Sequence, residues 1–317
     1  MRKAEPMLRI IINPASRSGK GLRIWNRKLK PYLESQKIDY EAVFTEKDKS
    51  AAELVRQFVR NATAFPIDIW ILGGDGTMNE AIQGIDDFAA VRLAYLPTGS
   101  SNDLARDLKI DKSLIRHVEH LLKEPLLQPC DIGEATYTCE DRTIVRRFDV
   151  GCGIGFDAAV CWHADHSKAK TILNKVGLGK LVYLFIALGQ IFGNKADPCS
   201  VYLDDAPPIT YDRFLFAVGM IHRYEGGGFM FCPHADASDG LLDVCIVGPV
   251  SKLGFLSAMP AAFKGKHIGK KHITEHRARE MRIVIRDPRY IHTDGEVRDM
   301  AVEVEMHCIG QQLQLLI

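Results

Sequence analysis

The first third of the chain alternates short apolar runs with amphipathic segments, and this alternation constrains the fold more than any other feature of the 317 residues. Four runs have the length and composition of buried strands: LRIIIN, DYEAVFT, IDIWILGG and VRLAYLP. Helical patterns separate them, the clearest being the apolar positions from Ala51 to Val59 behind the candidate cap Ser50. Runs this apolar are typical of parallel strands buried on both faces. The segment therefore predicts a parallel sheet with flanking helices.

From about Pro129 the pattern changes to short alternating runs separated by turns, which predicts an antiparallel β domain. Helical insertions are expected around 157–190 and 252–264. The chain is longer than one hydrophobic core usually supports, so two domains are expected. We predict an α/β domain over 1–128 and a β domain over 129–304, with a C-terminal segment of about 305–317 that returns to the first domain.

Charge and cysteine content exclude several classes of protein. Lys and Arg total 41 and Asp and Glu total 40, so the net charge of +1 predicts no nucleic-acid partner. The eight cysteines form no CxxC pair, which favours a reducing, cytoplasmic compartment. The apolar run before Asn13 is too short for a signal peptide. The stretch from Leu181 to Phe192 is well short of the roughly 20 residues that span a bilayer.

The polar, glycine-rich segments fall at the ends of the predicted strands, where parallel sheets bind ligands. GGDGTMNEAI, from Gly73 to Ile82, follows one strand and opens a helix. Adjacent glycines allow close approach of a ligand, and N–H groups at a helix start favour phosphate oxygens. Asp75 would repel phosphate unless a cation lay between them, which suggests Mg²⁺ with a nucleotide. A tight strand-to-helix connection explains the glycines about equally well.

Two further strand ends carry a similar set of residues. PTGSSNDLARDL follows the next strand, although Asp103 could serve there only as a helix N-cap. NPASRSGKG follows the first strand and offers an amide, hydroxyls and glycines. It is not a Walker A loop, because Pro14 stands where that motif requires glycine. The three segments together predict one shared site for phosphate and metal.

Six motifs taken together resemble the diacylglycerol kinase catalytic family, especially its soluble bacterial lipid kinases. They are NPAS, GGDGTMNE, PTGSSNDLAR, VGCGIGFDAAV, GGGFMFCPHADASDGLLDV and HTDGEV. GGDGT alone is shared with NAD kinases, and the combination with PTGSSND and DGE is far more specific. The resemblance extends over essentially the whole chain. It implies an ATP-dependent lipid kinase with an NAD kinase/diacylglycerol kinase-like α/β domain, formed by a parallel sheet with flanking helices, and an antiparallel β-sandwich second domain.

The resemblance also implies roles for individual residues. The ATP-binding set is Asn13, Pro14, Ser16, Thr45, Gly73, Gly74, Asp75, Gly76, Thr77, Asn79, Glu80, Ser100, Asn102 and Asp103. Asp75 and Asp103 match an acidic network linked to Mg²⁺, and a second Mg²⁺ is assigned to Asp236, Asp239 and the carbonyl of Leu241. Two positions depart from the family: Arg17 stands where glycine is frequent, and Ser100 replaces the usual threonine.

Asp294 and Glu296 match the family's DGE carboxylates, of which the glutamate is taken as proton acceptor. Phosphoryl transfer to an alcohol needs a carboxylate that orients the hydroxyl and accepts its proton. The pair follows an apolar strand and flanks a glycine, so both carboxyl groups are expected near one another on a turn. The same letters are compatible with a simple Asp-Gly hairpin turn.

The predicted reaction is transfer of the γ-phosphate of ATP to a lipid hydroxyl, with diacylglycerol as the first choice of acceptor. Sphingoid base, ceramide and phosphatidylglycerol remain open as substrates. The alternatives are an NAD kinase-like enzyme and a catalytically silent, nucleotide-binding regulator, and the retained acidic residues disfavour the second. The lipid would be drawn from a membrane surface by peripheral contact. Basic residues between Lys264 and Arg279 could meet an anionic surface or form a solvated loop. A homodimer is one option for the oligomeric state.

Overall fold

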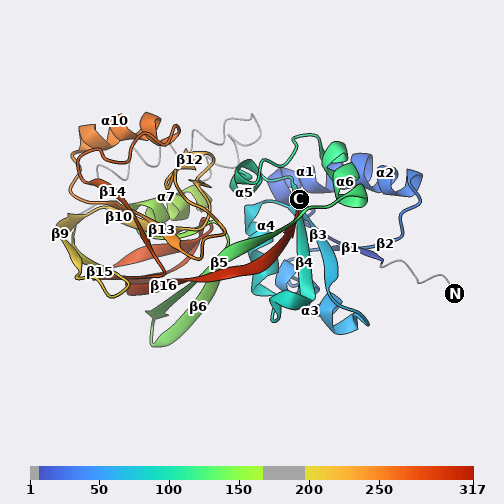
Figure 1. Cartoon of the computed structure of the whole chain (residues 1–317), viewed down its shortest axis with the longest axis horizontal. Helices are drawn as coiled ribbons and strands as arrows, with labels where there is room; N and C mark the ends of the chain where they lie inside the picture. The colour runs from blue at the N-terminus through green and yellow to red at the C-terminus, as the bar shows by residue number, and fades with distance from the viewer. Residues whose placement is uncertain (1–6, 167–196) are drawn as a thin grey trace. The chain divides into compact units, whose positions relative to one another are not determined.

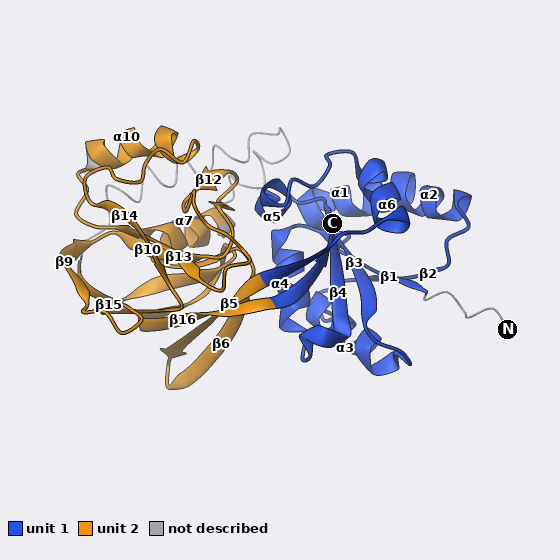
Figure 2. Cartoon of the chain, in the orientation of Figure 1, with its two compact units in different colours: residues 1–130, 312–317 blue, residues 131–311 orange. Residues whose placement is uncertain are grey.

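The computed structural model describes residues 7–166 and 197–317 (Figure 1). The chain forms two compact units, Met1–Cys130 with Gln312–Ile317, and Asp131–Gln311 (Figure 2). Strands β5 and β16 each run from one unit into the other. The apolar stretch 181–192 and most of the predicted insertion 157–190 lie outside the described residues.

The first unit is built on a parallel sheet with the strand order β16-β4-β3-β1-β2. Its strands are β1 (Leu8–Ile12), β2 (Tyr40–Phe44), β3 (Ile67–Gly73), β4 (Val91–Pro97) and the end of β16, where Gln314–Leu316 pairs parallel to Arg92–Ala94. β1, β3 and β4 are largely buried because helices cover the sheet, which explains their unbroken apolar runs. The four predicted strands are confirmed.

Helices follow β1, β2, β3 and β4 of the first unit. They are α1 (Ser16–Ile24), the π-helical η1 (Trp25–Leu29), α2 (Lys30–Ser35), α3 (Ala51–Asn61), α4 (Asp75–Gln83), the 3₁₀ turn η2 (Phe88–Ala90), α5 (Asp103–Asp107) and α6 (Leu114–Lys123). α3 begins where predicted, because Ser50 and Glu53 form a reciprocal capping box. Its buried face, which includes Leu54, Val55 and Phe58, packs on the core. α1, α4 and α5 start at the carboxyl ends of strands, the edge where the predicted site lies.

The second unit is an antiparallel β sandwich, as the sequence predicts. Its main path has the order β14-β13-β10-β7-β15-β16, with β8 and β9 beside β15 and β5 paired with β6. The strands are β5 (Leu127–Cys139), β6 (Arg142–Phe148), β7 (Gly151–Gly155), β8 (Asp197–Leu203), β9 (Ile209–Phe214), β10 (Phe216–Met220), β11 (Tyr224–Glu225), β12 (Phe229–Met230), β13 (Leu242–Val247), β14 (Ile273–Ala278), β15 (Glu280–Thr293) and β16 (Glu296–Leu316).

Two described helices belong to this unit, α7 (Phe156–Asp165) and α10 (Lys252–Ala262). α7 begins directly at the end of β7, and α10 follows β13 with Ser251 capping its first turn. The sandwich core contains side chains from β7, β10, β13 and β15, including Ile154, Val244 and Ile283. No helix among residues 7–166 and 197–317 is long and apolar enough to cross a membrane.

Candidate active site and substrate pocket

Side-chain hydrogen bonds join the three strand ends of the first unit. The amide of Asn13, after β1, donates to the hydroxyl of Thr77 in α4 over 2.9 Å. The hydroxyls of Ser16 and Thr98 lie 2.8 Å apart, which connects the start of α1 to the segment after β4. The three predicted loops therefore form one cluster. Thr98, almost fully buried, is a member that the sequence analysis missed, since it chose the exposed Ser100 as the hydroxyl of that loop.

Glycines let the loops after β3 and β4 approach each other closely. A Cβ atom on Gly99 would lie 2.7 Å from the Cα of Gly74, and one on Gly73 would lie 2.5 Å from the Cβ of Thr77. Real Cβ atoms do not approach other heavy atoms so closely, so a larger residue would push the loops apart. Gly74 also precedes the first residue of α4, whose N–H groups face the start of the helix.

Asp75 is held by donors from β4 and α5. Its Oδ1 accepts a 3.1 Å hydrogen bond from the hydroxyl of Tyr95, and its Oδ2 accepts one of 3.1 Å from the N–H of Asp103. The carboxylate of Asp103 pairs in turn with Arg106. The interpretation of Asp103 as an N-cap is wrong, because α5 begins at Asp103 itself and Asn102 holds the cap position with a left-handed φ of 51°. The two carboxylates offer the oxygen donors that Mg²⁺ binds.

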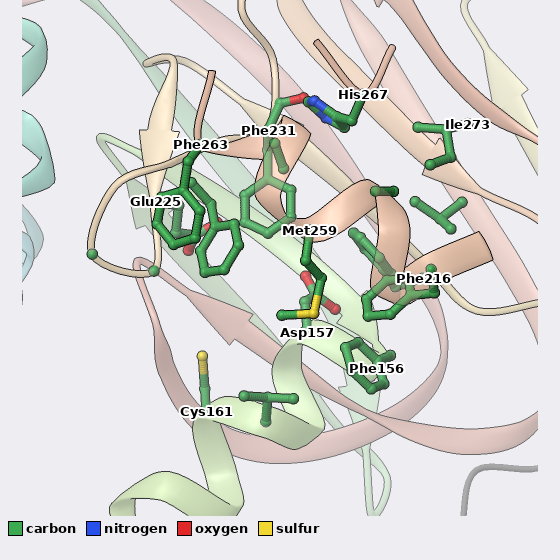
Figure 3. Close-up of a pocket in the computed structure, with 18 of the residues that line it drawn as sticks. Phe156, Asp157, Cys161, Phe216, Glu225, Phe231, Met259, Phe263, His267 and Ile273 are labelled. Carbon is green, nitrogen blue, oxygen red and sulfur yellow. The ribbon is translucent and has the colours of Figure 1, made fainter. Parts of the chain in front are cut away.

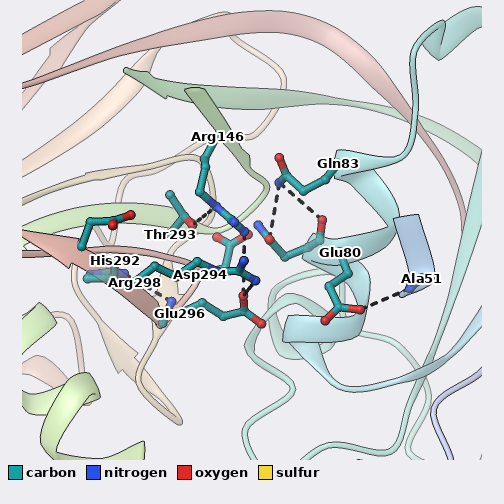
Figure 4. Close-up of polar contacts among 12 residues, drawn as sticks. Ala51, Glu80, Gln83, Arg146, His292, Thr293, Asp294, Glu296 and Arg298 are labelled. Atoms are coloured by element: carbon teal, nitrogen blue, oxygen red, sulfur yellow. Dashed lines mark hydrogen bonds and ion pairs between the residues drawn. The ribbon is translucent and has the colours of Figure 1, made fainter. Parts of the chain in front are cut away.

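Other members of the predicted nucleotide set contact the protein itself. Glu80 accepts the N–H of Ala51 at the start of α3 over 3.2 Å (Figure 4). Asn102 donates to the carbonyl of Gly99 over 3.1 Å, which closes the loop after β4. Asn79 is fully buried, and Thr45 is half-buried at the end of β2. Their nucleotide contacts stay predictions, as do those of Pro14 and Gly76.

The backbone conformation at Arg17 explains why glycine is frequent at this position in the family that the sequence resembles. Arg17, Ser18 and Gly19 all have left-handed backbone angles, with φ values of 44°, 54° and 83°. Residues with a Cβ atom are strained in this region, whereas glycine adopts it freely. The first loop therefore keeps its conformation in this chain at a cost in backbone strain.

In the second unit, Asp294 and Gly295 form a two-residue turn between β15 and β16, with φ values of 50° and 79°. The Asp294 carboxylate accepts three backbone N–H groups, from Asp149 at 3.0 Å and from Val150 and Gly151 at 2.9 Å each. It therefore fastens the turn to the start of β7. The sequence predicts two carboxyl groups near one another on a turn, and in the structure Asp294 uses its carboxylate to anchor that turn.

Glu296 lies beside two arginines (Figure 4). Its Oε2 is 3.3 Å from Arg298 and 3.8 Å from Arg146, and its side chain is partly exposed. Arg146 also donates to the hydroxyl of Thr293 over 3.2 Å. The carboxylate of Glu296 is thus oriented by side chains while solvent still reaches it, which leaves it accessible to a substrate.

The predicted second metal ligands lie on one loop before β13. Asp236 accepts hydrogen bonds from Ser238, while Asp239 accepts the N–H of Leu241 at 3.0 Å and lies 3.5 Å from Arg277. Two carboxylates and a carbonyl are ligands of the kind that Mg²⁺ prefers. Across residues 7–166 and 197–317, however, no group of three or more His, Cys, Asp or Glu side chains is close enough to hold a metal ion.

A cavity of about 250 Å³ lies within the second unit, between α7, α10 and the strands (Figure 3). The cavity was not predictable from the sequence, because its wall comes from segments spread over more than 130 residues. The phenylalanines that line it are Phe156, Phe216, Phe229, Phe231, Phe255 and Phe263. Apolar cavities with a few polar groups are typical sites for small ligands.

Three polar residues meet on the wall of this cavity. The Nε2 atom of His292 lies 2.9 Å from Asp157 Oδ2, and its Nδ1 lies 3.2 Å from Glu225 Oε1. Burial alone would lower the pKa of His292, but Glu225 and Asp157 outweigh burial and raise the pKa to about 9. A Cβ atom on Gly153 would overlap both the Asp157 carboxylate and the imidazole. The VGCGIG motif thus includes a glycine that makes room for this cluster.

The two units match two family models. Residues 7–135 match the diacylglycerol kinase catalytic domain, and residues 151–317 match the YegS C-terminal NAD kinase beta sandwich-like domain. A fold and site of this kind define a lipid kinase. The chain belongs to the family of bacterial lipid kinases that combine these two domains.

Individual relatives cover nearly the whole chain. A Bacillus subtilis protein named lipid kinase YtlR is 29% identical over 290 residues, which are 90% of this chain and 92% of that protein. A diacylglycerol kinase from the same organism is 25% identical and covers 92% of this chain and 90% of its own length. A crystal structure of a diacylglycerol kinase from Bacillus anthracis shares the fold, with a TM-score of 0.67 at 18% identity over 99% of this chain and 98% of that one.

Proposed function

We propose that this kinase transfers the γ-phosphate of ATP to the free hydroxyl of diacylglycerol and so forms phosphatidic acid for phospholipid biosynthesis. The observation that carries the lipid part is the phenylalanine-lined cavity of the second unit, which is large enough for part of an alkyl chain. The choice of diacylglycerol as the acceptor rests on relatives that are named diacylglycerol kinase. Transfer to NAD is the rival reaction, because GGDGT is shared with NAD kinases, and the phenylalanine-lined cavity favours a lipid acceptor over it.

ATP binding is assigned to the first unit. The hydroxyls and amide that join its loops, together with the start of α4, supply hydrogen-bond donors of the kind that bind phosphate oxygens. Asp75 and Asp103 would hold Mg²⁺, which neutralises charge on the phosphates when bound. Tyr95 orients Asp75 through its 3.1 Å hydrogen bond. Gly74 and Gly99 keep the two loops close enough for all these groups to act together.

Glu296 is the proposed proton acceptor. A base must lie within hydrogen-bond distance of the hydroxyl whose proton it takes, so its carboxylate has to be both accessible and fixed. Glu296 meets both conditions, being partly exposed and positioned by Arg298 and Arg146. The proton of the lipid hydroxyl would pass to one of its Oε atoms as the new P–O bond forms and the bond from the γ-phosphorus to the bridging oxygen breaks, which releases ADP. Asp294 acts through the backbone, by holding the turn that carries Glu296.

A second Mg²⁺ at Asp236, Asp239 and Leu241 remains part of the proposal. Binding there would require Asp239 to exchange Arg277 for the metal, since the two side chains lie 3.5 Å apart. The test compares melting temperatures with and without Mg²⁺ for wild type and Asp239→Asn. A metal at this loop stabilises the native state by mass action, so the Mg²⁺ increment should vanish in the variant. An unchanged rise in melting temperature with Mg²⁺ would contradict a metal site at this loop.

Contact with a membrane surface is proposed for α10 and the residues that follow it. Leu253 and Phe263 are 80% and 50% exposed, although both are large and apolar. Lys264 and Lys266 follow Phe263 and are exposed. Exposed apolar side chains beside lysines favour the surface of an anionic bilayer. Because Phe263 also lines the cavity, a lipid could pass from that surface into the pocket.

One assay tests the proposed reaction. Purified protein is given ATP, Mg²⁺ and diacylglycerol in mixed micelles, with NAD, sphingoid base, ceramide and phosphatidylglycerol as parallel acceptors. We expect phosphatidic acid as the main product. Phosphorylation of NAD alone would show the rival activity, and preference for another lipid would correct the acceptor.

A further inference from the structure

One carboxylate oxygen of Asp157 accepts no hydrogen bond from the described residues. The cavity wall is largely apolar; its charged groups meet at Asp157, Glu225 and His292, and His267 also lines it. Figure 3 shows the carboxyl groups of Asp157 and Glu225 among the phenylalanines. Oδ2 of Asp157 accepts from His292 over 2.9 Å. Its Oδ1 is buried and has no hydrogen-bond partner among the described residues, and the side chain is only 9% exposed.

A buried carboxylate oxygen without a donor is costly. Leaving a buried polar atom unsatisfied costs about 1–3 kcal/mol, and more when the group is charged. The cost is removed when a ligand donates a hydrogen bond to that oxygen. Because Asp157 lines the cavity, a ligand bound there would lie against the residue that carries this oxygen.

The charges of the cluster favour the same kind of ligand. His292 is almost fully buried, and at neutral pH its imidazolium carries one positive charge between the two carboxylates of Asp157 and Glu225. The three groups therefore have a formal charge of −1. Such a cluster attracts a hydroxyl hydrogen or an ammonium group and repels a group that can only accept hydrogen bonds.

We propose that Asp157 is a specificity-determining residue of the lipid pocket, which selects an alkyl chain that carries a hydrogen-bond donor, a hydroxyl or an ammonium group. His292 is the positioning residue that directs the carboxylate, and Gly153 leaves the space that their hydrogen bond requires. The inference rests on the proposed function, in which this cavity receives the lipid.

Matched short ligands test the selection without any turnover. The cavity volume corresponds to about eight groups of water size, so eight-carbon probes suit it. Calorimetric titrations compare octan-1-ol, octylammonium and 1-methoxyoctane, which differ in hydrogen-bond donation at one end. A hydrogen bond to a charged group is worth about 1.5–3 kcal/mol, which is about 10- to 150-fold in affinity. We expect both donors to bind at least tenfold more tightly than the ether.

Asp157→Asn should abolish or reverse the preference for the alcohol over the ether. His292 needs an acceptor at its Nε2, so the amide oxygen should face the imidazole and the NH₂ group should take the place of Oδ1 at the cavity. The ether, as an acceptor, should then bind at least as well as the alcohol. The matched control is Val160→Ala, which removes apolar atoms from the cavity wall on the same helix. It should weaken the binding of all three probes while the ratio of their affinities stays the same.

Equal affinity of wild type for alcohol and ether, within twofold, overturns the proposal, even if the variant cannot be purified. A tenfold preference that persists in Asp157→Asn overturns it as well. Failure of all three probes to bind contradicts a lipid-binding cavity and the proposal together. Phosphorylation of diacylglycerol is measured separately on the same protein, so loss of the proposed function and loss of donor selection are distinguishable.

Discussion

The amide of Asn13 donates to the hydroxyl of Thr77, 64 residues further along the chain, over 2.9 Å. The bond fastens the loop after β1 to helix α4, so the two residues should contribute to ATP binding as a unit. We expect Asn13→Ala and Thr77→Val each to lower ATP affinity about 5- to 30-fold, from about 1–2 kcal/mol of lost positioning. The double variant should lose less than the sum. Titration with ATP of all four proteins measures the coupling. Strict additivity would mean that the bond has no role in the site.

Glu296 and Asp294 should differ in what their loss affects. Glu296→Gln keeps the shape of the side chain and removes its basicity, so turnover should fall about 10²- to 10⁴-fold with little change in melting temperature. Asp294→Asn should instead destabilise the protein by about 1–3 kcal/mol, because an NH₂ group replaces an oxygen that accepts backbone N–H groups. Turnover and denaturation are measured for both. Wild-type turnover in Glu296→Gln would exclude it as the base.

The strand pattern predicted most of the first unit because each apolar run is local. β1, β3 and β4 are continuous in sequence, and the glycines and hydroxyls that follow them lie at one sheet edge for topological reasons alone. The hydrogen bond of Tyr95 to Asp75 was not predictable, since a tyrosine inside an apolar strand is usually a core residue.

The polar cluster of the cavity could not be predicted for a different reason. Asp157, Glu225 and His292 are single residues on α7, β11 and β15, separated by 68 and 67 positions, and no spacing rule connects them. Each adjoins or lies within a glycine-containing motif, which is the only local signal. The domain limits predicted from the change in pattern near residue 129 remain predictions. Long-range antiparallel pairing also decided the lengths of β15 and β16, which the sequence divided into shorter runs.

Arg17→Gly should stabilise the protein. Arg17 has a φ of 44°, where a residue with a Cβ atom is strained by about 1–2 kcal/mol, while glycine loses about 0.5–1 kcal/mol in chain entropy. The net gain should be about 0.5–1 kcal/mol. The matched control is Arg23→Gly, an exposed position in the regular part of α1, which should destabilise by about 1 kcal/mol. Thermal and urea denaturation measure both. A loss of stability in Arg17→Gly would show that its side chain makes a compensating contact.

His292 should make stability depend on pH in a defined window. Despite the opposing effect of burial, Glu225 and Asp157 raise its pKa from 6.5 to about 9, so the folded protein holds a proton that the unfolded chain has lost above pH 6.5. Its contribution is therefore complete below pH 6.5 and disappears as pH rises through 9. Burial lowers the pKa of His117 and His267, so these residues act in the opposite direction. Their contribution to stability is complete above pH 6.5 and is lost as the pH falls below that value. The two effects therefore occupy different ranges of pH.

Loss of the proton from His292 should also change the hydrogen-bond partner of its Nδ1 atom. Nδ1 lies 3.2 Å from Glu225 Oε1 and 3.2 Å from the N–H of Gly295 in the turn that precedes Glu296. The protonated ring donates to Glu225, whereas the neutral ring can only accept from Gly295. Imidazole NMR titration should show one histidine with a pKa near 9, absent in His292→Gln, and that variant should lose the fall in stability between pH 6.5 and 9. A His292 resonance that titrates below pH 7 would contradict the charged cluster, because the neutral ring would then be the native form.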